Sequence, residues 1–220
     1  AVQVLEQAVA LARQVETSHV FMLASSSLAY TLIQLGKLHQ AHAVCQEAMQ
    51  AAEAYQGQNG QPLTSAASVY AQYASILTAW GEIQAAIQVA RQGVTLAERW
   101  GQADTITVCL LNLIRALTLA KETEATQQAL LRARNLARQV SAWFVFNVDM
   151  LEIQFYLDNH EVNQALRAAR LASGELPLIL QARLLIKQEC YSQALSLLES
   201  QRSQAEQASP LESIHIHALR

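Results

Sequence analysis

One short pattern recurs about five times along this chain and constrains its fold more than any other feature. Each copy has a point that breaks a helix, an apolar residue two positions later, and a small residue that opens a second amphipathic helix. Residues 35–41 and 80–86 are the clearest copies, and in both an alanine follows a glycine by five positions. The inward stripe continues at Cys45 and Ala48 in the first copy and at Ala90 and Gly93 in the second.

Three later copies are less regular. The third, around residues 121–125, is aligned mainly by the helix that follows it, and its register is open by one residue. In the fourth, Asn159 or His160 takes the place of the glycine before Ala165, and the fifth precedes Ala194. A small residue at the opening of each second helix lets two helices approach closely, while large residues of the first helix pack over it.

The pattern predicts an all-α protein, a superhelical solenoid of about five to six antiparallel helix pairs that is tetratricopeptide-like. The composition agrees, because good helix formers dominate and only 7 Gly and 3 Pro interrupt them. We expect helices over residues 2–15, 18–35, 38–56, 62–80, 83–99, 103–120, 123–140, 142–158, 161–173, 178–187, 191–206 and 210–220.

No linker divides the chain, so we expect residues 1–220 to form a single repeat domain. The longest connection, residues 56–62, has two Gly and one Pro and is interpreted as a turn. Residues 1–15 and 210–220 each pattern as half of an incomplete helix pair, which predicts a fragment of a larger multidomain protein.

Charge and cysteine usage narrow the function classes. A net charge of -3 without a cationic stripe argues against direct nucleic acid contact from this segment. No apolar run approaches the ~20 residues of a membrane span, so no membrane partner is expected. The three cysteines are odd in number, far apart and expected at apolar helical positions, which favours buried thiols and a cytoplasmic location.

Candidate catalytic and metal-binding residues are weak. His39 and His42, like His215 and His217, lack nearby cysteines or well-placed carboxylates, so no metal is expected. Acidic pairs such as Glu122 with Glu124 are typical of solvated helix faces. The segment has no phosphate-binding loop, and no cofactor and no catalytic residue are expected in it. The enzyme alternative, a helical α/α barrel, would need acid clusters that are missing here.

The concave face of the solenoid is the predicted binding surface, because the first helix of each pair lines it. Its side chains are polar, nearly uncharged and interspersed with aromatics, with Arg115 as a candidate anchor for a carboxylate, phosphate or peptide terminus. The predicted ligand-binding residues are Tyr30, Gln34, Gln72, Ser75, Thr78, Asn112, Arg115, Thr118, Asn147, Met150 and Gln154.

Tryptophans fall at expected helix ends. Trp80 and Trp100 precede glycines and are expected to cover hairpin turns. The apolar run 143–146 cannot face one core with all its side chains, so it is expected to contact another domain or a second copy of the chain.

The sequence resembles the helical repeat region of MalT-like, LuxR-type ATP-dependent transcriptional regulators. The resemblance rests first on repeats of about 40 residues, which are longer than the roughly 34 of a standard tetratricopeptide unit. It rests also on second helices that end in Leu-Ala-Arg or Leu-Ala-Glu-Arg, at Leu11–Arg13, Leu96–Arg99 and Leu136–Arg138, and on the run Ala90–Gly101. It implies a non-catalytic sensor module that binds an inducer, such as an oligosaccharide, or a protein partner and couples binding to oligomerisation. A generic protein-interaction scaffold without a small-molecule ligand is the alternative.

Overall fold

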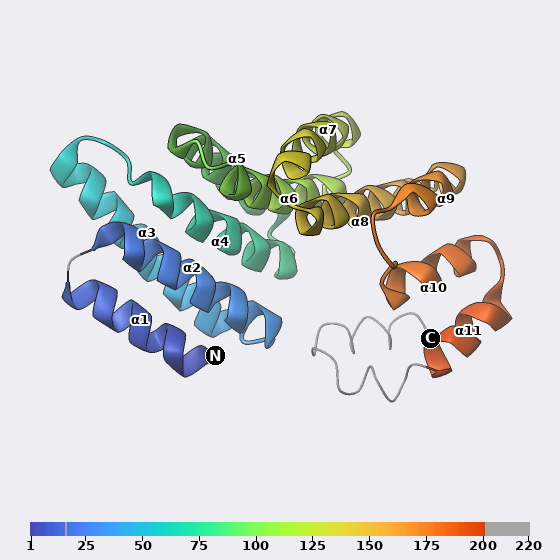
Figure 1. Ribbon diagram of the computed structural model, residues 1–220, viewed down its shortest axis with the longest axis horizontal. Helices are drawn as coiled ribbons and strands as arrows, with labels where there is room; N and C mark the ends of the chain where they lie inside the picture. Colours follow the sequence, from blue (N-terminus) through green and yellow to red (C-terminus); the bar gives the residue numbers. More distant parts are fainter. Residues whose placement is uncertain (16, 201–220) are drawn as a thin grey trace. The chain divides into compact units, whose positions relative to one another are not determined.

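The computed structural model describes residues 1–15 and 17–200, and most of them lie in helices (Figure 1). No strand occurs in these residues, so the predicted all-α class is confirmed. The helices are α1 (Val2–Gln14), α2 (Ser18–Gln34), α3 (Leu38–Asn59), a 3-10 turn η1 (Thr64–Ala66), α4 (Ala67–Ala79), α5 (Ile83–Trp100), α6 (Ala103–Leu119), α7 (Thr123–Val140), α8 (Ala142–Asp158), α9 (Val162–Leu171), α10 (Leu178–Lys187) and α11 (Tyr191–Ser200).

The expected helix boundaries hold within a few residues, with two differences. α3 runs on to Asn59, where Gly60 ends it in the left-handed conformation at φ 69°. The helix expected from residue 62 begins as the short η1 turn, so α4 proper starts at Ala67. The end of the helix expected over 191–206 and the helix expected over 210–220 lie outside the described residues.

A left-handed residue marks the turn of each helix pair. Gly36 and Gly81 have φ of 71° and 79°, and Lys121, His160 and Glu189 adopt the same conformation at 59°, 61° and 61°. These positions fix the registers that the sequence leaves open: the third copy turns at Lys121, and the fourth turns at His160 rather than at its neighbour.

The small residue five positions after each turn is buried in every copy. Ala41, Ala86, Ala165 and Ala194 occupy this position, and the third copy uses Thr126 there. The Thr126 hydroxyl donates to the carbonyl oxygen of Glu122 at 2.8 Å, which satisfies its polar group inside the helix contact. The predicted packing of small against large residues is therefore the packing that forms the hairpins.

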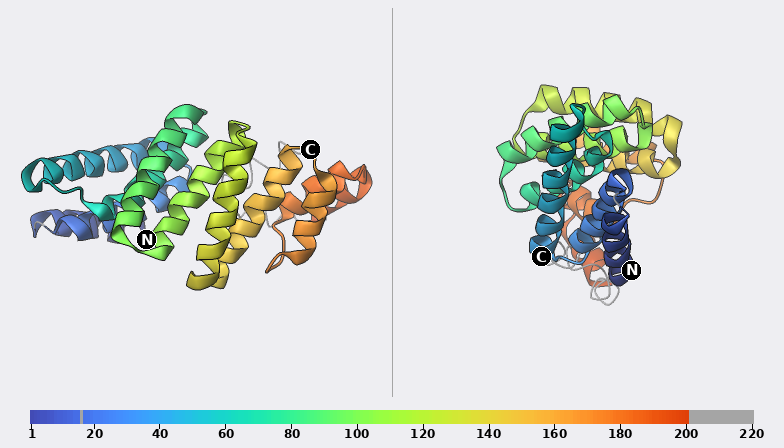
Figure 2. Two further views of the ribbon diagram at one scale, coloured as in Figure 1. Left: turned by 90° about the horizontal axis from the view of Figure 1, so that it is seen from above. Right: turned by 90° about the vertical axis from the view of Figure 1, so that its left-hand side faces the viewer.

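The first compact unit comprises Ala1–Val140, and its helices form two layers. The first helices of the pairs, α2, α4 and α6, pack side by side, whereas α3, α5 and α7 barely touch one another in the part of the chain that the structure describes. Figure 2 shows these helices following one another in chain order. The closer approach of α2, α4 and α6 makes theirs the inner layer of the unit.

Close packing inside this unit uses small residues at the helix contacts. A Cβ built on Gly93 of α5 would lie 3.1 Å from Tyr70 Cβ and 3.5 Å from Cys109 Sγ. Ser26 on α2 is buried and donates to the carbonyl oxygen of Ser68 at 3.1 Å. Ser25 and Ser26 thus lie at a close helix contact, as expected, whereas Ser27 of the same run is exposed.

The second compact unit begins at Ser141, and its described helices are α8, α9, α10 and α11. Its core contains Ile153, Leu157, Ala165 and Leu180. Asp149 is buried and accepts two hydrogen bonds from Ser173, from the backbone N–H and the hydroxyl, each at 3.0 Å. A single domain over residues 1–220 stays a prediction. None of the described helices is both long enough and apolar enough to cross a membrane.

Candidate binding groove

We call the solvent-facing surface of α2, α4 and α6 the inner groove, after the binding groove that the sequence predicts on these helices. Tyr30 is 48% exposed, Gln34 and Arg115 are also exposed, and Ser75, Thr78 and Thr118 are half-buried. Six of the predicted ligand-binding residues therefore reach solvent on these three helices.

Arg115 is the only one of these six that carries a formal charge. Its Nη1 donates to Asn112 Oδ1 at 3.2 Å, and it forms no ion pair with another described residue. Protein surrounds the guanidinium closely enough that desolvation lowers its pKa, while the nearby Tyr30 acts in the opposite direction. An arginine stays cationic at neutral pH under these conditions, and its other N–H donors have no partner among the described residues.

Arg115 is exposed to solvent and still loses part of its hydration to neighbouring protein. The influence of Tyr30 on Arg115 also shows that α2 and α6 bring these two predicted residues near each other.

Two other predicted residues are mostly buried. Gln72 is 8% exposed and Asn112 is 6% exposed, so little of either side chain is available to a ligand. Asn112 donates from Nδ2 to the carbonyl oxygen of Val108 at 3.1 Å while its Oδ1 holds Arg115, which makes it a positioning residue for the guanidinium.

The hydroxyl groups of the groove are partly engaged with their own helices. Thr78 and Thr118 each donate to a carbonyl oxygen four residues earlier, at 2.8 Å in both cases. Their oxygens keep lone pairs that can accept hydrogen bonds. The groove therefore offers acceptors from its threonines and donors from Arg115.

The last three predicted residues belong to the second unit. Met150 packs against its hydrophobic core and is a structural residue there. Asn147 donates from Nδ2 to the carbonyl oxygen of Trp143 at 2.8 Å, and Gln154 is half-buried on the same helix, α8. The inner groove of the first unit is thus built without them.

The histidines considered as metal ligands have packing partners instead. The rings of His42 and Trp80 lie 4.9 Å apart, those of His39 and Trp80 lie 5.4 Å apart, and His42 Nε2 is 3.3 Å from the Tyr73 hydroxyl. No group of three potential ligands that could hold a metal occurs in the described residues. His215 and His217 lie outside them.

The cysteines divide into two kinds. Cys45 and Cys109 are fully buried, and burial raises the pKa of each thiol to about 12. Cys109 Sγ also donates to the carbonyl oxygen of Ala67 at 3.4 Å. The expectation for Cys190 was wrong, because it is half-buried in the turn before α11 rather than inside a helix.

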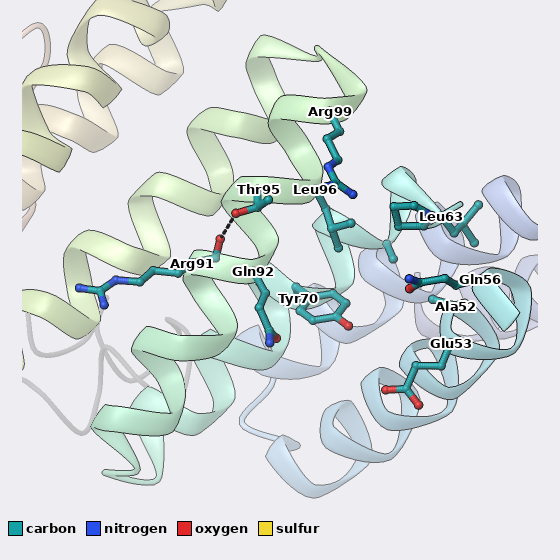
Figure 3. Close-up of a pocket in the computed structure, with 12 residues that line it drawn as sticks. Ala52, Glu53, Gln56, Leu63, Tyr70, Arg91, Gln92, Thr95, Leu96 and Arg99 are labelled. Atoms are coloured by element: carbon teal, nitrogen blue, oxygen red, sulfur yellow. Dashed lines mark hydrogen bonds between the residues drawn. The ribbon is translucent and has the colours of Figure 1, made fainter. Parts of the chain in front are cut away.

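A second cavity, which sequence reasoning missed, lies between the outer helices α3 and α5 (Figure 3). This outer pocket has a volume of 380 Å³, and its walls include Glu53, Gln56, Leu63, Tyr70, Leu96 and Arg99. None of the predicted ligand-binding residues lines it. The unusually long connection after α3 was the available signal, because it supplies the Pro62 and Leu63 side of the pocket.

Comparisons with known proteins agree with this architecture. A crystal structure of BtubC (BKLC) from P. vanneervenii is similar at a TM-score of 0.56 and 14% identity, covering 99% of this chain and 90% of that one. At this identity the likeness concerns the fold alone. No curated protein matches the sequence. The family model of the MalT-like TPR region matches residues 1–218. The chain, whose described helix pairs each turn at a left-handed residue, therefore belongs to the family of MalT-like TPR regions.

Proposed function

We propose that this helical repeat module is the non-catalytic sensor of a cytoplasmic, LuxR-type bacterial transcription regulator. In this proposal the inner groove binds an inducer or a protein partner, and binding is coupled to oligomerisation. Family membership supports the regulator context. The observation that carries the ligand-binding part is Arg115, an exposed but partly desolvated cation without an ion-pair partner among the described residues.

The chemistry of the groove favours a polar ligand with at least one anionic or carbonyl-rich group. The free N–H donors of Arg115 can form charge-assisted hydrogen bonds, which are stronger than neutral ones and fix orientation. Tyr30 adds an exposed aromatic face, and Thr78 and Thr118 supply acceptors. An oligosaccharide or a peptide segment presents the hydroxyl and amide donors that such acceptors bind.

Thermal unfolding against a panel of oligosaccharides, metabolites and peptides tests the proposal. A ligand present at ~100 times its Kd adds about 2.7 kcal/mol of stability. Arg115→Gln is expected to abolish the shift, because it removes the charge and the forked donors. Arg138→Gln, an exposed arginine on α7, is the matched control and is expected to keep it.

Two results would point elsewhere. A shift of equal size in wild type and Arg115→Gln would remove the inner groove from the proposal. The absence of any shift across the panel would favour the scaffold alternative, in which the repeats position other domains and the partner is a protein.

A further inference from the structure

The outer pocket stays open because its neighbouring helices do not close on each other. α3 and α5 barely touch in the described chain. Two of the residues that line the pocket, Ala52 and Ala66, have small side chains. Tyr70 of α4 lies in the gap between the two helices, as Figure 3 shows. The volume of 380 Å³ falls within the ~300–1,000 Å³ typical of ligand pockets.

Two opposite charges face this pocket without neutralising each other. Figure 3 shows the Glu53 carboxylate and the Arg99 guanidinium on opposite sides of it, with Gln56 and Tyr70 between them. Neither charged group forms an ion pair or hydrogen bond with another described residue. The other arginine of the pocket wall, Arg91, points away in Figure 3, and its Nη2 lies 3.5 Å from Glu122 Oε2.

The helix dipole accounts for only part of this arrangement. Arg99 lies in the last turn of α5, where a cation interacts favourably with the helix end. That interaction does not use the fork of N–H donors, and it does not explain a carboxylate on the facing helix. Glu53 also acts on the pocket interior, since Tyr70 has its pKa raised by desolvation first and by the Glu53 charge second.

We propose that the outer pocket binds a dipeptide with apolar side chains, whose two charged ends are separated by a peptide unit. The ligand carboxylate pairs with the Arg99 guanidinium, and its ammonium group pairs with the Glu53 carboxylate. An apolar side chain packs on Tyr70 between Leu63 and Leu96, which are the large apolar residues of the wall. This site lies on the outer layer and is independent of the proposed function of the inner groove.

The first experiment is a binding screen by saturation-transfer NMR and thermal unfolding. The probes are the standard L-amino acids together with L-leucyl-L-leucine and L-phenylalanyl-L-phenylalanine. We expect saturable binding by the two dipeptides and weaker binding by the single amino acids, because the ammonium and carboxylate of an amino acid are joined to one carbon and do not reach both charged side chains. The N-acetyl amide of the best probe has the same side chains but neither charge, and we expect it to bind at least about tenfold more weakly, because it loses both charged contacts.

Point variants then locate the site. Glu53→Gln and Arg99→Gln are each expected to weaken the best probe by about tenfold or more, because each removes one charged contact. Arg138→Gln is the control for removal of an exposed arginine from an outer helix, and Arg115→Gln is the control for the inner groove.

The outcomes separate this proposal from the proposed function. The outer-pocket proposal is overturned if no probe binds, if the uncharged amide binds equally well, or if both pocket variants keep wild-type affinity. Binding that is lost only in Arg115→Gln would also overturn it, and would place the ligand in the inner groove.

Discussion

Alkaline pH is expected to destabilise the first unit through its two buried thiols. An exposed cysteine thiol has a pKa of 9.0, and burial raises the pKa of Cys45 and of Cys109 to about 12. Below pH 9 both thiols are protonated whether the chain is folded or unfolded, so they do not affect stability. Between pH 9 and 12 the unfolded chain releases protons that the folded chain retains, so stability falls as pH rises.

The magnitude follows from the size of the pKa shift. Each pH unit above 9 costs about 1.4 kcal/mol per thiol. Raising the pH from 8 to 10 should therefore lower the free energy of unfolding by about 1.4 kcal/mol for each of Cys45 and Cys109. Other groups that titrate in this range, including Tyr70, also contribute, so the thiol contribution has to be isolated by difference.

Urea unfolding under reducing conditions at both pH values, followed by circular dichroism, measures that difference. Between pH 8 and 10, the free energy of unfolding of Cys109→Ala is expected to fall by about 1.4 kcal/mol less than that of wild type. For the double variant, Cys45→Ala with Cys109→Ala, the fall is expected to be smaller than that of wild type by about 2.8 kcal/mol. Val69→Ala is the matched control, because it opens a cavity at a fully buried position without removing a thiol. An identical pH dependence in wild type and the double variant would refute the reasoning.

Three further predictions concern single positions. Lys121→Gly should raise the free energy of unfolding by about 0.5–1 kcal/mol in urea titrations. Glycine removes the left-handed strain of ~1–2 kcal/mol at φ 59°, and the larger conformational entropy that glycine gives the unfolded chain offsets part of this gain. A loss of stability would contradict the prediction. Gly93→Leu should destabilise by about 1–3 kcal/mol or more in the same assay. Gly93→Ala should destabilise by less, because its Cβ, 3.1 Å from Tyr70 Cβ, requires only a small shift of that neighbour. Cys190 should react with a thiol reagent in the native protein, whereas the two buried cysteines should react only after unfolding. Mass spectrometry of the labelled peptides measures this, and labelling of Cys109 in the native protein would contradict it.

The helix pairs could be predicted from sequence because their determinants are local. A helix-breaking residue followed five positions later by a small residue specifies a turn and a close helix contact wherever it occurs. Gly36 and Gly81 meet the conformational need of the turn without strain. The third copy was harder to align because Lys121 and Thr126 occupy the same two positions, and neither residue type is typical of its position.

The inner groove was only partly predictable. Tyr30 and Arg115 reach solvent on the inner layer, and the structure brings them near each other. Helical spacing alone could not separate them from Gln72 and Asn112, which lie on the same helices but are nearly buried. The burial of a side chain on the flank of a helix depends on how the next hairpin packs against that helix. This packing is not a local property of either helix.

The sequence by itself thus determined the all-α class, most helix boundaries and the hairpin turns at Gly36 and Gly81, because apolar period and turn residues act within a few residues of one another. Only the tertiary structure decided that Met150 is a core residue and that Glu53 and Arg99 face one cavity without pairing. The outer pocket exists because α3 and α5, separated in sequence by the 60–66 connection and α4, leave a gap over Tyr70. Such a gap results from side-chain packing between hairpins, which no repeat pattern along the chain encodes.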